Sequence, residues 1–316
     1  MSLDPESKQW LKRILGENVI FDEPMARHTS FRVGGPAEAY IAPVNTKCLT
    51  EIIHWSVEKG IPYMVIGDGT NLLVKDSGIQ GLAIVLKKCL EKISKTGADQ
   101  HGSTVTAMAG AKMQALCWFA INRGLEGMNF ALGIPGTVGG GIMTNAGTAL
   151  GSVEEAIDSV KILLPTGQIR EIGRNHLRFS YRGLKWKDEN GGIPQGQHII
   201  LEGCFCLGSS DSLALKREAE AILKRRKEWQ PARYPSAGCF FKNPPSGKTA
   251  GELIDQAGLK KKKVGDAAVS EKHANFIVNT GNATAADILS LMEHVQETVF
   301  KLFNIKLEPE VKIVGT

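Results

Sequence analysis

Glycine dominates one stretch of the chain in a pattern that suits phosphate binding. Between residues 129 and 147, glycine recurs at every third position as Gly133, Gly136 and Gly139, among small and apolar residues. Backbone without a Cβ atom adopts positive φ and approaches a ligand closely, and successive N–H groups then surround an anion. No Lys-Ser/Thr pair follows the glycines, which excludes a P-loop. The stretch predicts a cradle for a phosphate-bearing cofactor, and composition leaves a plain connecting turn open as the alternative.

A shorter glycine motif, Gly67-Asp-Gly-Thr-Asn71, follows an apolar, strand-like run. It resembles the start of a dinucleotide fingerprint, but Leu72 stands where the third glycine belongs. No acidic residue follows at the spacing of a ribose ligand. Taken alone, this motif is weak evidence for a nucleotide.

Cysteine and charged residues offer other candidates for chemistry. The six cysteines are scattered without the spacing of zinc ligands, so no metal site is predicted and reduced, mostly buried thiols are expected. Cys239 is the exception, because it lies in a small-residue turn between prolines. Glu310 lies on the polar face of an alternating C-terminal run, where the pattern alone favours a solvated residue. The basic run at 224–227 closes a predicted helix, where cations suit the helix dipole and a solvated face is expected.

Composition narrows the class of protein. The chain has 316 residues, 42% hydrophobic and 22% charged, which is typical of a soluble globular protein. This length suggests about two or three domains. A net charge of +5 with interspersed signs favours neither nucleic acid nor a membrane surface as partner. No apolar run could span a bilayer and no signal-peptide pattern opens the chain, so a cytoplasmic protein is expected.

Periodicity predicts the elements that must position these residues. Helices are predicted over 46–59, 112–123, 212–229 and 249–257, and from a capping box at Thr284 along an apolar stripe to Leu302. The helix over 212–229 is expected to bury Leu215, Ala219, Ile222 and Leu223. Strands are predicted over 61–66, 82–86, 103–108, 157–164, 168–172, 199–207 and 305–313, with a hairpin at 165–167. The first segment is typical of α/β and the strand-rich middle segment of α+β.

Several motifs, in order along the chain, carry a resemblance to a known family. They are Thr29-Ser-Phe-Arg-Val-Gly-Gly-Pro36, Gly67-Asp-Gly-Thr-Asn-Leu-Leu-Val74, Gly133-Ile-Pro-Gly-Thr-Val-Gly-Gly140 with Asn145-Ala-Gly147, Tyr181-Arg182, Pro235-Ser-Ala-Gly-Cys-Phe-Phe-Lys-Asn-Pro244, Lys272-His-Ala-Asn-Phe-Ile-Val-Asn279 and Glu308-Pro-Glu-Val311. Together they resemble the UDP-N-acetylenolpyruvoylglucosamine reductases, the MurB family, from about residue 20 to the C-terminus. Motifs in the correct order are far more specific than any one of them.

The resemblance implies an α+β fold. It consists of a two-part FAD-binding region of the vanillyl-alcohol-oxidase (PCMH) type and a smaller α+β substrate-binding domain. We expect FAD-binding subdomains over 1–88 and 89–210, a substrate-binding domain over 211–303, and a C-terminal strand over 304–316 that carries a catalytic glutamate. No insertion between Gly258 and Asn279 matches the tyrosine-bearing loop of one subtype. The subtype that lacks this loop is therefore expected.

The resemblance also implies a flavin-dependent reduction in peptidoglycan precursor synthesis. NADPH would reduce FAD, and hydride from FAD would convert UDP-N-acetylenolpyruvoylglucosamine to UDP-N-acetylmuramate. The implied catalytic residues are Arg182 and Glu310, against the substrate carboxylate, and Cys239, as proton donor. The commonest family pattern has serine at position 239. A thiol, with a pKa of about 8.5, is the stronger acid, but a nearby cation that favoured the thiolate would spoil proton donation.

The same motifs assign binding residues. Those implied for FAD are Arg32, Gly34, Gly67, Gly69, Thr70, Asn71, Gly133, Pro135, Gly136, Thr137, Gly139, Gly140, Asn145 and Gly147. Those implied for the substrate are Tyr181, Lys242, Asn243, Lys272, His273 and Asn275. The expected partners are NADPH and UDP-N-acetylenolpyruvoylglucosamine, without nucleic acid or membrane, and a monomer is expected.

Two other functions stay open. Another flavin oxidase or dehydrogenase, acting on an alcohol or amine, would keep the glycine-rich stretch but would not need Cys239 or Glu310. A non-catalytic nucleotide-binding module would keep the fold without the chemistry. The retention of Arg182 together with Cys239 and Glu310 argues against the second of these.

Overall fold

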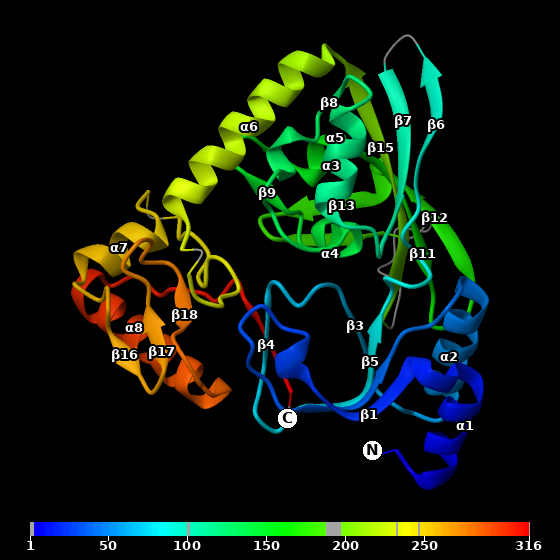
Figure 1. Ribbon diagram of the computed structural model, residues 1–316, viewed down its shortest axis with the longest axis horizontal. Helices are drawn as coiled ribbons and strands as arrows, with labels where there is room; N and C mark the ends of the chain where they lie inside the picture. The colour runs from blue at the N-terminus through cyan, green and yellow to red at the C-terminus, as the bar shows by residue number, and fades with distance from the viewer. Residues whose placement is uncertain (1–2, 100–101, 188–196, 232, 246, 316) are drawn as a thin grey trace. The chain divides into compact units, whose positions relative to one another are not determined.

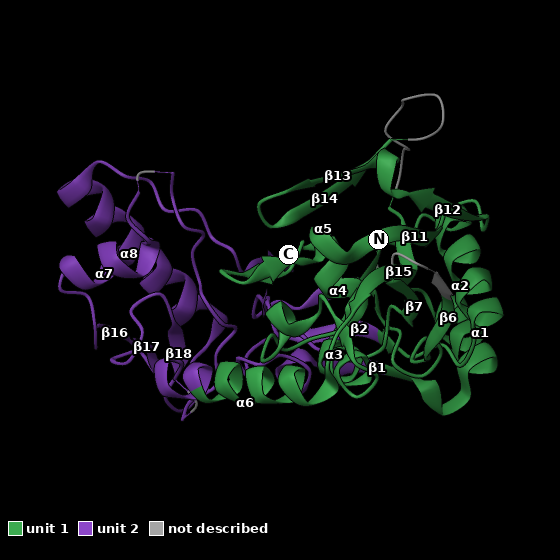
Figure 2. Ribbon diagram, turned by 90° about the horizontal axis from the view of Figure 1, so that it is seen from above, with its two compact units in different colours: residues 1–20, 40–67, 81–224 green, residues 21–39, 68–80, 225–316 purple. Residues whose placement is uncertain are grey.

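The computed structural model describes residues 3–99, 102–187, 197–231, 233–245 and 247–315. The chain divides into two compact units, which Figure 2 distinguishes by colour. Unit 1 consists of residues 1–20, 40–67 and 81–224, and unit 2 of residues 21–39, 68–80 and 225–316. Each unit is thus assembled from segments far apart in the sequence. The shorter glycine motif is divided between them, with Gly67 in unit 1 and Gly69 in unit 2.

Unit 1 contains a large antiparallel sheet. Its order is β12 (Ile169–Gly173), β11 (Ile157–Leu163), β15 (Ile199–Ser209), β7 (Gly102–Met108) and β6 (Ile93–Asp99), with the short β8 (Leu125–Glu126) paired to the end of β15. Gly167, at φ +84°, closes the predicted hairpin between β11 and β12. The strands predicted for this region are confirmed.

A six-residue helix made largely of glycine lies on this sheet. Figure 1 shows α4 (Val138–Met143) beside β15, and α3 (Met113–Ile121) contacts α4. Ile142 of α4 fits where Gly203 of β15 has no side chain, because a Cβ atom there would lie 2.6 Å from Ile142 Cδ1. Helix α3 confirms the prediction over 112–123. This packing fixes the glycine-rich stretch on the sheet.

A smaller sheet has the order β1 (Val19–Pro24), β2 (Pro36–Ile41), β5 (Ile79–Val85) and β3 (Tyr63–Ile66). Strands β3 and β5 run parallel. Because parallel neighbours require a crossover, the chain between them is long enough to carry further structure. It contains the whole of the shorter glycine motif and a further strand.

The N-terminal part of unit 1 is helical. Helix α2 (Thr46–Glu58) confirms its prediction, and the Asn45 side chain caps it by accepting a hydrogen bond from the Cys48 N–H at 2.8 Å. Helix α1 (Pro5–Leu15) was not predicted. Its Trp10 stacks on Trp55 of α2 with ring centroids 4.2 Å apart, which joins the two helices.

The remaining elements of unit 1 are short. They are α5 (Val153–Ala156), β9 (Gly147–Thr148), β10 (Gly151–Ser152), β13 (Leu177–Ser180), β14 (Gly183–Trp186) and 3₁₀ turns at Gly16–Asn18, Asn129–Ala131 and Arg174–His176. Strands β13 and β14 form a hairpin whose tip is Tyr181-Arg182. The hairpin therefore positions a predicted catalytic residue.

Unit 2 is built around two helices and a small sheet. Helices α7 (Ala250–Gln256) and α8 (Ala285–Phe303) belong to it with the antiparallel strands β16 (Lys263–Val264), β17 (Ala267–Val269) and β18 (Ile277–Asn279), as Figure 1 shows. The N-terminal segment enters the same core through Phe31 and Val33, close to a 3₁₀ turn at Met25–Arg27. Strand β4 (Leu72–Val74) pairs in parallel with β19 (Lys312–Val314).

Helix α6 (Ser212–Trp229) covers its predicted range, but the prediction of its buried face is half wrong. Leu215 and Ala219 are buried, whereas Ile222 and Leu223 are only half-buried. Most of its other side chains are polar, so little apolar surface is available to bury. Within the described ranges, no helix combines the length and apolar character needed to cross a membrane.

The C-terminal predictions also need correction. The buried stripe of α8 stops at Val299, and Leu302 is 58% exposed because the helix ends one residue later, at Phe303. The strand predicted over 305–313 is much shorter, since β19 covers only Lys312–Val314. Pro309 has no N–H to donate to a ladder, and Glu310 lies two residues before β19.

Helix α8 begins at a double cap. The Thr284 hydroxyl and the Asp287 carboxylate form the predicted capping box. The carboxylate of Asp76, from the loop after β4, also accepts hydrogen bonds from the N–H groups of Ala285 at 2.9 Å and Ala286 at 3.0 Å. A carboxylate at this end suits the helix dipole. Asp76 thus ties the glycine-motif segment to α8.

We predict that Asp76→Ala destabilises α8. The variant leaves two N–H groups at the helix start without their acceptors, which should cost about 1 kcal/mol. Hydrogen exchange of the α8 amides, followed by mass spectrometry, measures the loss of protection. Glu293→Ala, an exposed position on the same helix, is the control and should leave protection unchanged. Equal protection in both variants would contradict the role of Asp76.

Candidate active site

The glycine-rich stretch of unit 1 contains two glycines with positive φ and helix α4. Gly133 and Gly136 have φ of +76° and +122°, which favours glycine at both positions. Thr137 then caps α4, with its hydroxyl accepting a hydrogen bond from the Gly140 N–H at 3.3 Å. At Gly139 a Cβ atom would lie 2.8 Å from the Cβ of Ala109. Glycine is therefore favoured at positions 133 and 136 by their backbone conformation and at position 139 by close packing.

The two glycine motifs meet inside unit 1. A Cβ atom on Gly67 would lie 2.7 Å from the Thr137 hydroxyl oxygen, so the end of the first motif touches the second. Among the described residues, none accepts a hydrogen bond from the N–H of Gly136 or of Thr137. Two neighbouring N–H groups of this kind fit a phosphate oxygen. Pro135 is exposed beside them.

Asn145 organises the end of this stretch. It has a positive φ of +42°, and its side-chain oxygen accepts a hydrogen bond from the Glu154 N–H at 3.0 Å. Its amide nitrogen donates to the Ser180 carbonyl at 3.3 Å, next to the tip of the β13–β14 hairpin. Asn145 thus links the glycine-rich stretch to the hairpin that carries Arg182.

Arg182 is held against the same stretch in a strained conformation. Its φ is +60°, a region that costs a residue with a Cβ atom about 1 kcal/mol or more. Its Nη1 donates a hydrogen bond to the Gly147 carbonyl at 3.2 Å, and its guanidinium carbon lies 5.2 Å from the Tyr181 ring centre. Tyr181 itself is 56% exposed. The hairpin presents a cation beside the predicted phosphate cradle.

In unit 2, the predicted cofactor residues of two segments lie together. The Ser30 N–H donates a hydrogen bond to the Gly69 carbonyl at 3.1 Å. Gly69 has φ +63°, and a Cβ atom on it would clash with the His28 carbonyl oxygen. Gly34, at φ +136°, packs on Val74 in the same way. Arg32, at φ +56°, is exposed on this loop, and Thr70 is half-buried next to Gly69.

Asn71 connects this motif to Glu310. The Asn71 side chain donates a hydrogen bond to the Glu310 carbonyl at 3.1 Å, and the Asn71 carbonyl accepts one from the Lys312 N–H at 3.1 Å. These bonds extend the parallel pairing of β4 with β19 by one residue. The main chain of Glu310 is therefore fixed from the cofactor motif.

The same ladder continues to Cys239. The Glu310 N–H donates to the Phe240 carbonyl at 2.8 Å, and the Lys242 N–H donates to the Glu308 carbonyl at 2.9 Å. Phe241 and Pro309 form an antiparallel bridge between these two segments. Two predicted catalytic residues from distant parts of the sequence, Cys239 and Glu310, thereby come within one residue of each other in one ladder. The Cys239 side chain is half-buried beside a small apolar cluster that includes Phe276.

Arg226 is a charged neighbour of Cys239 that the sequence interpretation missed. Burial lowers the pKa of Arg226, and negative charge on Cys239 opposes that lowering, so the two groups interact electrostatically. The other cations of the run, Lys224, Arg225 and Lys227, are exposed as expected, but Arg226 is half-buried with an inaccessible Nε. Its position continues the inward spacing of α6 after Leu215, Ala219 and Ile222, and this was the available signal.

The residues predicted to bind substrate all lie in unit 2, except Tyr181. Lys242 pairs with the Glu308 carboxylate at 3.3 Å, and the Asn243 side chain accepts a hydrogen bond from the Ala250 N–H at 3.1 Å. Lys272 donates to the Lys227 carbonyl at 2.8 Å. The described residues contain no group of three or more His, Cys, Asp or Glu side chains placed to hold a metal ion.

Comparisons with known proteins identify the family. A model of the FAD binding domain matches residues 37–173, and one of the C-terminal domain of UDP-N-acetylenolpyruvoylglucosamine reductase matches residues 230–314. A UDP-N-acetylenolpyruvoylglucosamine reductase of Desulfosudis oleivorans is 46% identical over 99% of this chain and 100% of its own length. The chain belongs to the UDP-N-acetylenolpyruvoylglucosamine reductase family.

Other members of this reductase family agree. The reductase of Agathobacter rectalis is 42% identical over 94% of both chains. The crystal structure of the Thermus caldophilus reductase, MurB, matches with a TM-score of 0.75 and 33% identity, over 94% of this chain and 98% of that one. The predicted family is confirmed. The α+β fold class, with an FAD-binding region and a separate C-terminal domain, is confirmed as well; the domain boundaries and the subtype stay predictions.

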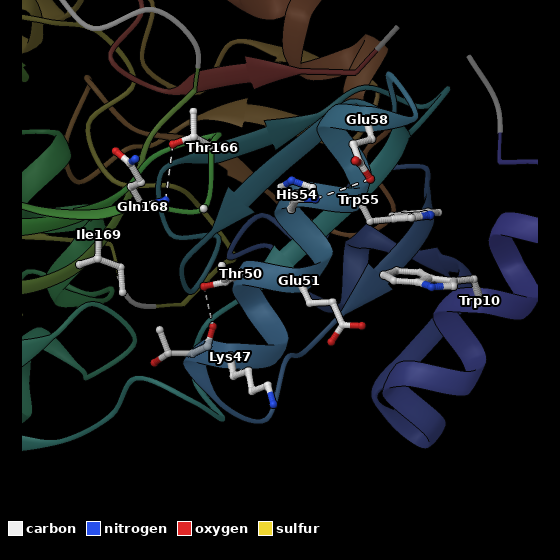
Figure 3. A pocket seen from close by; sticks show the side chains of 12 residues that line it. Trp10, Lys47, Thr50, Glu51, His54, Trp55, Glu58, Thr166, Gln168 and Ile169 are labelled. Atoms are coloured by element: carbon white, nitrogen blue, oxygen red, sulfur yellow. Dashed lines mark hydrogen bonds and ion pairs between the residues drawn. The ribbon is translucent and has the colours of Figure 1, made fainter.

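One groove of unit 1 is lined by residues from α1, from α2 and from the β11–β12 turn. It has a volume of about 920 Å³ and is open to solvent. Figure 3 shows Trp10 and Trp55 stacked at one side of it, and Thr166 and Gln168 from the β11–β12 turn at the other. None of the predicted site residues lines it. The shape of the groove does not identify a ligand.

His273 is the predicted substrate residue whose surroundings fix its protonation. Burial lowers its pKa, and the charge of Lys260 adds to the effect, although a backbone hydrogen bond partly opposes them. Its Nδ1 accepts a hydrogen bond from the Asn275 N–H at 3.2 Å, which requires Nδ1 without a proton. The neutral imidazole is therefore part of the folded structure.

We predict that His273 makes unit 2 less stable in mild acid. The unfolded chain protonates this histidine near its ordinary pKa of about 6.5, and the folded chain only at lower pH. Its contribution to stability is thus complete above about pH 6.5 and is lost as the pH falls below that value. Urea unfolding between about pH 7.5 and about pH 5.5 should show a steeper loss for the native protein than for His273→Gln. Parallel curves would contradict this assignment.

Proposed function

We propose that this protein reduces the enolpyruvyl group of UDP-N-acetylenolpyruvoylglucosamine, with FAD as cofactor and NADPH as reductant, and forms UDP-N-acetylmuramate for peptidoglycan synthesis. The observation that carries the proposal is the ladder that holds Cys239 and Glu310 one residue apart. A turn with a thiol and a carboxylate suits proton transfer better than it suits an anonymous nucleotide site. Membership of the reductase family supports the same reaction. We further propose that the protein acts as a monomer in the cytoplasm.

FAD, when bound, supplies the hydride chemistry. In unit 1 its pyrophosphate would be held by the N–H groups of Gly136 and Thr137 and by backbone near Gly67. In unit 2 the exposed Arg32 and the Gly69–Asn71 backbone are the further residues for the cofactor. A pyrophosphate is stabilised by positive charge and by N–H groups that donate hydrogen bonds to its oxygens.

The protein residues manage the charge that hydride addition creates on the substrate. Addition at the methylene carbon pushes electrons into the neighbouring carboxylate. Arg182 offers that carboxylate a planar pair of N–H donors, which suits a developing dianion better than a lysine ammonium does. Glu310 donates a hydrogen bond to the same group in its protonated form. The strained backbone of Arg182 is consistent with a residue retained for its side chain.

Cys239 completes the reduction. Its S–H gives a proton to the second carbon of the enolate-like intermediate, and the thiolate that remains must be reprotonated before the next turnover. Arg226 affects this step because its positive charge favours the thiolate. The role therefore requires a working pH at which Cys239 still carries its proton.

We predict that Cys239→Ala separates the two half-reactions. The variant keeps the cofactor residues, so NADPH should still bleach the flavin at the native rate, but the enolpyruvyl substrate should no longer reoxidise it because the proton donor is missing. Stopped-flow absorbance of the flavin measures both steps. Cys206→Ala, which removes an exposed thiol on β15, is the matched control and should leave both rates unchanged. Normal reoxidation by Cys239→Ala would rule out the proton-donor role.

We also predict a pH dependence that Arg226 controls. The reoxidation rate should fall as the pH rises and Cys239 loses its proton. Arg226→Gln removes the charge that favours the thiolate, so this fall should move to higher pH. Stopped-flow reoxidation across a pH series measures the midpoint, and Arg225→Gln, the exposed neighbour, should not move it. An identical midpoint in both variants would be evidence against the coupling.

A further inference from the structure

The Asn275 side chain is fully occupied with the main chain that follows Cys239. Its amide oxygen accepts a hydrogen bond from the Phe241 N–H at 2.9 Å, and its amide nitrogen donates to the Phe241 carbonyl at 2.8 Å. Its own carbonyl accepts from the Phe240 N–H at 2.7 Å. Asn275 is only 3% exposed. A side chain so buried and engaged is poorly placed to contact a substrate.

These bonds replace a missing strand neighbour. The segment after Cys239 has the Glu308–Glu310 segment on one edge. On the other edge, the Asn275 side chain offers an acceptor and a donor to one residue, as a paired strand would. Without it, both buried main-chain groups of Phe241 would lose a partner, which is costly in a core. Asn275 thus closes the second edge of the ladder.

The position of the thiol depends on this closure. Upstream of Cys239, Gly238 has φ +79° and a Cβ atom there would meet nothing within 4 Å, whereas Ala237 is buried in the core of unit 2. Downstream, Phe240 and Phe241 are almost completely buried and serve as anchors. The hydrogen bonds of Asn275 fix the main chain of both anchors. Asn275 therefore fixes the main chain directly after the thiol.

Asn275 is itself held in a built turn. The Ser270 N–H donates to the Phe276 carbonyl at 2.8 Å, and the Phe276 N–H donates to the His273 carbonyl at 3.0 Å. The Ser270 hydroxyl accepts from the His273 N–H at 3.4 Å, and Asn275 donates its N–H to the His273 ring. The turn orients the amide of Asn275 before it meets Phe241.

We propose that Asn275 is a positioning residue of the reductase: it fixes the main chain after Cys239 so that the thiol stays where it donates its proton. The inference rests on the proposed function, because it takes Cys239 as the proton donor. It replaces direct substrate binding, the role expected for Asn275 from the family motif.

Asn275→Ala tests this in the flavin half-reactions. A misplaced donor should slow reoxidation by the enolpyruvyl substrate by about tenfold or more. Reduction by NADPH should stay close to the native rate, because it does not use the thiol. Thr284→Ala is the control for general destabilisation of unit 2, since it weakens the exposed cap of α8 and should leave both rates unchanged. Equal reoxidation rates in Asn275→Ala and Thr284→Ala would overturn the proposal.

A second measurement does not depend on turnover. Iodoacetamide labelling, quantified by mass spectrometry, gives the rate at Cys239 relative to the exposed Cys206 in unit 1. A released loop should raise this ratio severalfold in Asn275→Ala and not in Thr284→Ala; an unchanged ratio contradicts the proposal. If wild-type flavin is reduced by NADPH but not reoxidised by the substrate, the proposed function fails, and the labelling ratio still decides the role of Asn275. Should Asn275→Ala not fold, Asn275→Asp keeps the acceptor for Phe241 and must raise the ratio in the same direction.

Discussion

The hydrogen bond from the Glu310 N–H to the Phe240 carbonyl is the contact on which the chemistry proposed for unit 2 depends. Through it, a segment from the end of the chain joins a turn some seventy residues earlier, and Asn71 fixes the other side of the Glu310 peptide. These bonds engage the main chain of Phe240 and Glu310 and do not use the side chains of Cys239 and Glu310.

Local sequence patterns predicted most of the helices, caps and turns. The helix predicted over 46–59, the capping box at Thr284 and the hairpin closed by Gly167 appeared where the sequence indicated, because each depends on neighbours a few residues apart. The family and fold class followed from motif order and are confirmed by the comparisons. The assigned site residues stay predictions, although the structure groups them: Gly67 with Thr137, and Asn71 with Glu310.

What escaped prediction depends on contacts between distant segments. The run after Ile305 alternates like a strand, but it pairs only through a bridge between Pro309 and Phe241 and through the three residues of β19, which pair with β4. Arg226 was grouped with three exposed cations, although its helical spacing turned it towards Cys239. Asn275 was assigned to the substrate because a motif reports which residues recur and not which atoms their side chains meet. Only the fold brings Arg226 to Cys239, and only the fold brings Asn275, from the turn at 270–276, to Phe241.

Among the described residues other than glycine, those with positive φ include Arg32, Asn145 and Arg182, each assigned to the site from sequence. At such a position, glycine is the residue that a purely stability-driven choice would select. Arg182 therefore costs the fold about 1 kcal/mol or more of stability at the hairpin tip, and it places a guanidinium there. With the role proposed for Arg182, stability and activity compete at this position, so selection of the chain for stability alone would favour a glycine that lacks the proposed catalytic side chain.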